Sequence, residues 1–495
     1  MNRLPSQAAF ITKRLFIAIG GLLLTAMVIP VQAEEAFPEL SPEVKTHEWA
    51  LSPAKEPHFA LQFKLLPPLN ERKPGNSAAY YNRATLFQAS LPKDPPELHD
   101  RYIEWFDLPC EKLPLNEAKA WLARRRVVLA ELQMATQCET CDWGTRFQDL
   151  RGMDVISVTL QEFQEARQLA RTLRLQAKVE IAEKRYDVAF KTIQQSYRLA
   201  QDLATVPMII VNLIAIASQS LANDSLSDLI AAEGSPNLYW ALRGLPDPLV
   251  DVSISTQFES SMAFRMFPFL VDADTAEHSP PEWHRLLASV NFNQLGSNES
   301  LANRTRITTL VTRSYPIAKR ELIAAGYDRE RIERMPVGQV VAIFARDCQR
   351  YAADQLVKWI FMPSSARTKA IEATQASLIR EGYLGTSDDA VADRDPLQIN
   401  TRVGYNLTGI SESSDRPRRV VTALATIEAI RMHAAHNNGH VPASLADISI
   451  VPVPSDPFTG KQLHYRVIDN RAELVITPTR PHYHFTGRRF LLRMR

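Results

Sequence analysis

Three histidines near the C-terminus have a spacing that could bind a metal ion. His433 and His436 are three residues apart at the expected end of a helix, and His440 follows in the loop beyond it. Residues three or four apart share a helix face, and grouped neutral imidazoles bind zinc or copper. Histidines also suit a solvated helix C-terminus, where they interact favourably with the helix dipole. His433, His436 and His440 are therefore a candidate metal site, with a solvated helix end as the alternative.

Four cysteines are present, and three of them lie in one stretch as Cys110, Cys138 and Cys141. This number suits one or two bridges in an exported protein. Cys138 and Cys141 also have the spacing of a redox motif, although the residues before them have a helical pattern. We predict a structural disulfide among Cys110, Cys138 and Cys141 with the pairing open. Free buried thiols and a redox or metal role are the alternatives.

The usual catalytic signatures are missing from the sequence. It contains no G-x-S-x-G, H-E-x-x-H, Walker A, G-x-G-x-x-G or EF-hand pattern. No catalytic residue and no cofactor are therefore assigned. The sequence favours a non-enzymatic protein, and an extracytoplasmic hydrolase that uses the histidines or unassigned carboxylates is an alternative.

Composition is that of a globular protein. The chain has 495 residues, of which 45% are hydrophobic and 23% charged, so it has room for several packed domains. Glycine is scarce (17) beside 32 prolines, which indicates helices separated by proline-marked breaks. The net charge of +2 carries no sign of nucleic-acid binding.

The first 33 residues have the pattern of a secretory signal peptide. Arg3, Lys13 and Arg14 precede an apolar run at 15–30, and small residues mark a cleavage site after Ala33. An uncleaved anchor is the alternative, because the run is long for a signal peptide but short for a membrane span. Both readings predict an extracytoplasmic protein of the periplasm or cell envelope, with the membrane contacted through this segment.

The helices that would position any site are most strongly patterned at 162–234. Apolar residues recur there every three or four positions in two runs, separated by a polar break at 183–187. A third run, 208–217, is apolar nearly all round and too short to cross a bilayer, so we expect a buried helix. The three helices are predicted to form a packing nucleus, and the charged face of the first is expected to lie in solvent, with Arg167, Arg171, Arg174, Lys178 and Glu180.

The predicted fold class is mainly α: an irregular body of antiparallel helices with a small C-terminal α+β unit of one helix and a β-hairpin. Residues 36–74 are proline-spaced and are expected to form an extended arm, and arginines 124–126 are expected to lie mostly in solvent. The expected segments are a signal peptide or anchor (1–33), a proline-rich arm with one helix (34–98), a helical core (99–265), a polar connecting segment (266–335), a long-helix segment (336–400) and the C-terminal α+β unit (401–495).

Two parts of the chain resemble known modules. The C-terminal unit has a helix at 417–436, the strings VPASL, DPFTGK and HYRV, and two alternating segments at 463–467 and 472–477 that predict a hairpin. It resembles the C-terminal region of type II secretion pseudopilins. The helical pair around the polar break resembles a single tetratricopeptide repeat in Tyr186, Ala189, Phe190 and Ser196.

Most of the chain after residue 33 resembles a family of uncharacterised envelope proteins of planctomycete bacteria. The resemblance is carried by residues 141–144 (CDWG), 169–189, 356–359 (LVKW) before Met362 and Pro363, and 424–465. It implies an envelope location and a helical fold, and no activity. The main hypothesis is therefore an exported, non-enzymatic helical scaffold that binds envelope proteins or peptides. The alternatives are an accessory of a secretion or pilus-like assembly and the hydrolase named above.

Overall fold

The computed structural model describes residues 37–152, 154, 163, 165–290, 301–385, 393–397, 407–469, 471–480 and 483–495. Within it Glu39–Arg495 forms one compact unit. The predicted signal peptide or anchor lies outside the described residues.

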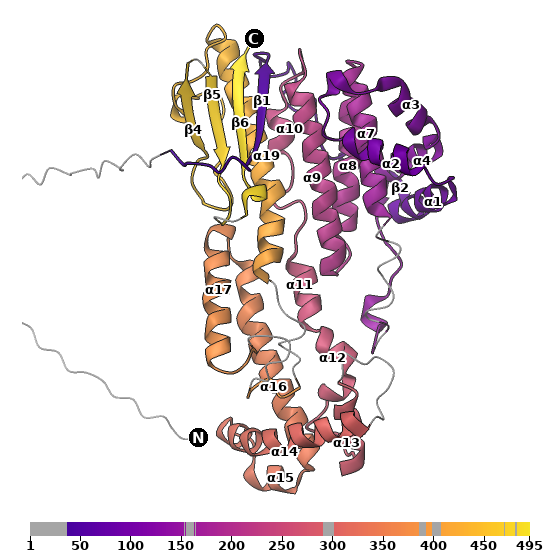
Figure 1. Ribbon diagram of the computed structural model, residues 1–495, viewed down its shortest axis with the longest axis vertical. Coiled ribbons are helices and arrows are strands. Elements are labelled where there is room, and N and C mark those ends of the chain that lie inside the picture. Colours follow the sequence, from indigo (N-terminus) through magenta and orange to yellow (C-terminus); the bar gives the residue numbers. More distant parts are fainter. Residues whose placement is uncertain are drawn as a thin grey trace, which may run out of the picture. The chain divides into compact units, whose positions relative to one another are not determined.

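The chain is mainly α-helical with a small C-terminal sheet, which confirms the predicted fold class (Figure 1). The helices are α1 (Ser77–Ser90), α2 (Pro96–Glu104), α3 (Leu115–Ala123), α4 (Arg126–Thr136), α7 (Ala166–Ala182), α8 (Tyr186–Leu203), α9 (Ile209–Ala231), α10 (Tyr239–Arg243), α11 (Ser253–Ser260), α12 (Met262–Met266), α13 (Pro280–Ala288), α14 (Leu301–Ala324), α15 (Arg329–Arg334), α16 (Val337–Val357), α17 (Ser364–Arg380) and α19 (Leu407–His436). The strands are β1 (Lys45–Leu51), β2 (Lys73–Asn76), β3 (Cys138–Thr140), β4 (His464–Ile468), β5 (Arg471–Ile476) and β6 (Arg488–Met494).

Helices α7, α8 and α9 pack side by side, as the sequence predicts (Figure 1). The break between α7 and α8 falls at Lys184, whose φ of 58° places it in the left-handed region. Helix α9 continues beyond the predicted apolar run to Ala231, and serine hydroxyls along it bond within the helix. Ser218 and Ser220, for example, each donate at 2.9 Å to the carbonyl four residues earlier. Such bonds satisfy a polar side chain without leaving the helix.

Among the described helices, α9 alone is long and apolar enough to cross a membrane by length and composition. It is packed against α7, α8 and α19, and much of its apolar surface is buried there. A core helix of a globular unit passes the same test of length and composition.

The N-terminal arm differs from the expectation, because it contributes a strand to the C-terminal sheet. The strand order is β1-β6-β5-β4, with β1 parallel to β6 and the other pairs antiparallel. The hairpin β4–β5 is confirmed. Leu51 at the end of β1 is fully buried, and His47 stacks on Phe490 of β6 with ring centroids 5.2 Å apart. The signal was present as a proline-free run between Pro42 and Pro53, which fits a strand.

Helix α19 begins at Leu407, ten residues before the proline that was expected to start it. A proline inside a helix removes one main-chain bond and costs about 3 kcal/mol. Packing against α9, α10 and α17 outweighs this cost. The carbonyl of Pro417 also accepts a bond from the side-chain amide of Asn223 on α9 at 2.9 Å.

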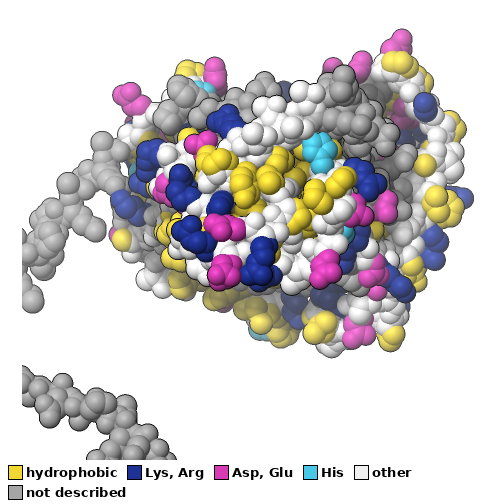
Figure 2. All heavy atoms as spheres, turned by 90° about the horizontal axis from the view of Figure 1, so that it is seen from below, with side chains coloured by type: hydrophobic (Ala, Val, Ile, Leu, Met, Phe, Trp, Pro, Cys, Tyr) yellow, Lys and Arg dark blue, Asp and Glu magenta, His cyan; other side chains and the backbone are white. Residues whose placement is uncertain are grey.

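The segment 266–335 was expected to be a polar connection, but its described residues are largely helical. Helices α13, α14 and α16 enclose a core that includes the fully buried Trp283 and Leu287. Helix α13 begins with a capping box between Ser279 and Glu282. Figure 2 shows hydrophobic side chains gathered among charged ones on the face seen from below. Many charged residues separate the periodic apolar positions of this segment, so the helical pattern is weak in the sequence.

The arginine run 124–126 is only partly in solvent. Arg124 and Arg126 are exposed, whereas Arg125 is buried between α3 and α4. Its guanidinium lies 3.3 Å from the centroid of Trp121 and donates to Asp94 at 2.8 Å. The chain kinks here into two helices, and the kink turns the middle side chain inward.

Candidate functional site

The three candidate metal ligands do not converge. His436 is exposed, and its Nδ1 lies 2.9 Å from the main-chain oxygen of Met432. His440 follows the left-handed residues Asn438 and Gly439, which turn the chain away from the helix. Burial lowers the pKa of His433, and His436 acts in the same direction. No three His, Cys, Asp or Glu side chains among the described residues are grouped to hold a metal ion. The geometry therefore corresponds to the solvated helix end.

The four cysteines are free thiols in the structure, so the expected bridge among Cys110, Cys138 and Cys141 is not formed. Cys138 begins strand β3 and Cys141 follows it. Three residues of extended chain span roughly 10 Å, and a disulfide requires Cα atoms within about 7 Å. Burial raises the pKa of Cys110 to about 12 and that of Cys141 further. Thiols with raised pKa values are poor nucleophiles, which also disfavours a redox role.

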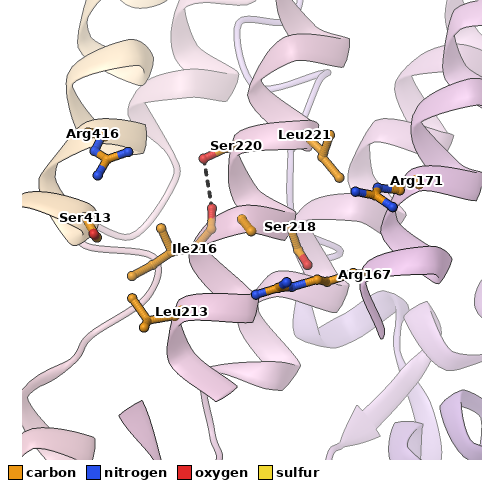
Figure 3. A pocket seen from close by; sticks show the side chains of 10 residues that line it. Arg167, Arg171, Leu213, Ile216, Ser218, Ser220, Leu221, Ser413 and Arg416 are labelled. Carbon is orange, nitrogen blue, oxygen red and sulfur yellow. Dashed lines mark hydrogen bonds between the residues drawn. The ribbon is translucent and has the colours of Figure 1, made fainter. Parts of the chain in front are cut away.

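A pocket of about 440 Å³ lies where α7, α9 and α19 meet (Figure 3). We call it the arginine pocket. Helix α9 supplies its floor, α7 one wall and α19 the other. Its lining residues are Arg167, Arg171, Leu213, Ile216, Ala217, Ser218, Ser220, Leu221, Ser413 and Arg416.

Three guanidinium groups line this pocket, and none of its lining residues is acidic. Arg167 and Arg171 are one turn apart on α7, and Arg416 reaches the pocket from α19 on the other side of α9 (Figure 3). Arg174, three residues after Arg171 on α7, has a partner, since it forms an ion pair with Asp228 of α9 at 2.6 Å. Within the described part of the chain, the three pocket arginines form no ion pair.

Arg416 is held in place by an aromatic ring. Its guanidinium carbon lies 4.8 Å from the ring centroid of Phe485, which belongs to the loop before β6. Its Nε is buried and has no hydrogen-bond partner among the described atoms. Burial lowers the pKa of Arg416, Glu412 opposes this shift and Arg488 adds to it. An arginine with pKa lowered from 12.5 in this way remains a cation at neutral pH.

The serine hydroxyls contribute little donor capacity. Ser218 donates to Ile214 and Ser220 to Ile216, so their protons are used inside α9 (Figure 3). Beside them the floor is apolar, with Leu213, Ile216 and Leu221. The pocket thus offers cationic N–H donors around an apolar surface.

In comparisons with known proteins, no family model, no curated protein and no solved structure matches this chain. Its function is therefore inferred from its own geometry.

The helical pattern predicts a solvated face for Arg167 and Arg171 and does not single out Arg416. The same prediction is wrong for Arg174, Lys178 and Glu180, which are buried with partners on neighbouring segments. One signal was available. Arg167 and Arg171 are like charges at i,i+4, and no acidic residue lies three or four positions from either in the sequence. Such pairs are mildly unfavourable in an isolated helix. The sequence does not reveal where α19 lies, and it is this helix that brings Arg416 to the same cavity.

A second cavity of about 590 Å³ lies near the start of α17 and includes Ser364, Arg418 and Asp456. Ser364 donates to Asp415 at 2.5 Å and accepts from Arg418 at 2.8 Å. This resembles a nucleophile beside a carboxylate, but Ser364 is 3% exposed and its hydrogen bonds are taken. Asp456 is likewise engaged with Arg419, at 2.7 Å. These hydrogen bonds and ion pairs link α17, α19 and the loop before β4.

Proposed function

We propose that this chain is an exported, non-enzymatic protein of the cell envelope whose helical body binds an anionic ligand in the arginine pocket. The observation that carries the proposal is the set of three guanidinium groups around one cavity without a carboxylate in its lining. The N-terminal pattern of basic residues, apolar run and small residues supports export.

The electrostatics of the pocket favour an anion. Arginine side chains in folded proteins normally find carboxylate partners when they are partly buried. Here Arg416 has a buried Nε without a partner, and its cavity is shared with Arg167 and Arg171. An anion that enters gains charge-assisted hydrogen bonds, which are about twice as strong as neutral ones.

Binding without turnover follows from the lining residues. General acid–base catalysis needs a group that exchanges a proton near neutral pH. The lining has no His, Cys, Asp, Glu or Lys, and arginine stays protonated. A serine nucleophile needs an adjacent base, and Ser218 and Ser220 donate only to main-chain oxygens. The pocket is therefore suited to hold a ligand rather than to transform it.

Calorimetric titration of the full chain with inorganic phosphate tests the binding site. We expect saturable binding that weakens as salt concentration rises, because salt screens the guanidinium charges. Arg167→Gln, Arg171→Gln and Arg416→Gln should each weaken it several-fold. Arg126→Gln is the matched control, since Arg126 is exposed and lies outside the pocket. No binding, or equal loss in all four variants, contradicts the proposal.

Export is tested separately by fractionating cells that express the full chain. We expect the protein in the periplasmic or envelope fraction, and we expect it in the cytoplasm when Arg3, Lys13 and Arg14 are all changed to Glu. Cytoplasmic recovery of the unaltered chain contradicts the proposed compartment.

A second candidate function is that of an accessory in a secretion or pilus-like assembly. Strand β4 lies at an edge of the C-terminal sheet, and its last residues Val467 and Ile468 are exposed. An open edge can pair with a strand of another chain. Recovery of secretion components with the chain from envelope fractions would support this role, and their absence would argue against it.

A further inference from the structure

We infer that the ligand of the arginine pocket is an amphiphilic organic anion, with a carboxylate or phosphate head group and an apolar chain. This inference rests on the proposed anion-binding function and specifies the chemistry of the ligand. It is carried by the combination of guanidinium groups and an apolar floor in one cavity.

The head group is assigned by the arginines. Arg416 extends from α19 and Arg167 from α7 toward α9, which lies between those two helices (Figure 3). A guanidinium has several N–H donors and no acceptor. A carboxylate or phosphate offers several acceptor oxygens, so it complements the arginines of either wall. The Nε of Arg416 is buried and has no hydrogen-bond partner among the described atoms.

The apolar chain of the ligand is inferred from the apolar residues of α9 in the floor of the pocket. Leu213, Ala217 and Leu221 are half-buried, so each presents part of its surface to the cavity. Apolar surface left in a pocket is covered favourably by apolar ligand atoms, since water is displaced from both. At about 440 Å³ the cavity lies within the range of small-molecule sites.

Polyhydroxylated ligands fit poorly. A sugar needs both donors and acceptors from its site, and its hydroxyl protons need carbonyl or carboxylate oxygens. The lining supplies no carboxylate, and the carbonyls of Ile214 and Ile216 already accept bonds from Ser218 and Ser220. Three serine hydroxyl oxygens can accept hydrogen bonds, but the guanidinium N–H donors outnumber them, which favours an acceptor-rich head group.

The test titrates the full chain with acetate, hexanoate and decanoate. Each methylene that enters an apolar site adds roughly two- to four-fold in affinity, so decanoate should bind far more tightly than acetate. Decanol lacks the charge and decyltrimethylammonium reverses it, and both should bind weakly or not at all. Decyl phosphate distinguishes the two head groups: whichever of decyl phosphate and decanoate binds more tightly identifies the natural one.

Two kinds of variant separate the contribution of the arginine charge from that of the apolar floor to the binding affinity. Arg416→Gln should weaken decanoate at least five-fold and leave the ratio of decanoate to hexanoate affinity unchanged. Ala217→Trp fills the cavity without altering its charge and should abolish decanoate binding. If Ala217→Trp fails to fold by circular dichroism, Leu213→Gln makes the floor polar and should flatten the dependence on chain length. Arg126→Gln should behave as the unaltered chain.

The outcomes distinguish this inference from the proposal on which it rests. Arginine-dependent binding of phosphate and acetate with no gain from longer chains retains the anion site and overturns the amphiphile. Tight binding of decanol or decyltrimethylammonium overturns the inference as well, because charge would then play no part. If no anion binds at all, both statements fail.

Discussion

Nε of Arg480 donates a hydrogen bond to Oε1 of Glu412 at 2.7 Å, and this contact leaves Arg416 without its nearest carboxylate. Glu412 and Arg416 are four residues apart on α19, the spacing at which glutamate and arginine ordinarily pair on a helix. Arg480 comes from the loop after β5 and also pairs with Glu372 of α17 at 3.0 Å. Arg480 therefore holds the carboxylate that lies one helical turn from Arg416.

Removing this contact should weaken anion binding from outside the pocket. In Arg480→Gln the carboxylate of Glu412 is released and can pair with Arg416, so we expect phosphate affinity to fall about three- to ten-fold. The double variant Arg480→Gln, Glu412→Gln should recover most of this loss, because no carboxylate is left to compete. Calorimetric titration measures all three forms. A double variant as weak as the single one contradicts the explanation.

Phe485 should matter for binding more than for stability. Its ring is 54% exposed and stacks on the guanidinium of Arg416. The ring holds the Arg416 guanidinium in position through an exposed cation–π contact of about 0.5–1 kcal/mol. Loss of that positioning in Phe485→Ala should lower anion affinity by at most about two- to five-fold. Because little buried surface is lost, the thermal midpoint should fall by no more than about 2 °C. Phe485→Tyr preserves the ring and should restore affinity. A large loss of thermal stability with unchanged affinity would contradict this role.

Gly338 should be intolerant of a side chain. A Cβ at this position of α16 would lie 2.9 Å from Cβ of Trp283 in α13. Overpacking of a core costs about 1–3 kcal/mol, and alanine recovers up to about 1 kcal/mol through its better helix propensity. Gly338→Ala should therefore lower the free energy of unfolding by about 1–2 kcal/mol in urea titration. The neighbouring exposed Val337 is the control, and Val337→Ala should change stability by less than about 0.5 kcal/mol.

Glu259 should make the fold less stable as the pH rises. Burial raises the pKa of Glu259 above its ordinary value of 4.5, and its Oε1 accepts only a weak bond from the main-chain N–H of Ile209 at 3.2 Å, which opposes the shift. The folded chain thus holds the proton more tightly than the unfolded chain. Its contribution to stability is present below 4.5 and is lost as pH rises through the raised pKa.

The corresponding variant is Glu259→Gln, which keeps the shape and removes the charge. Its free energy of unfolding should equal or exceed that of the unaltered chain at pH 7.5, with the difference shrinking at pH 5. Urea titration at both pH values provides the comparison. Greater destabilisation by the variant at pH 7.5 than at pH 5 would show that the sign is wrong.

Local features were predictable because their causes lie within a few residues. The break at Lys184 between α7 and α8 follows from the end of an apolar repeat and a run of charges. The hairpin β4–β5 follows from two alternating segments around a turn. Helical and strand periodicities act at short range, so one sequence is enough to reveal them.

Pairings between distant segments were decided only by the tertiary structure. Strand β1, near the N-terminus, pairs with β6 at the C-terminus, and no local pattern in either strand predicts this pairing. Arg125 leaves the solvent because α3 and α4 kink around Trp121 and Asp94. The sequence by itself determined the mainly helical class and the individual helices. The arginine pocket exists because packing brings α19 beside α7 and α9, and long-range burial rather than local propensity sets that arrangement.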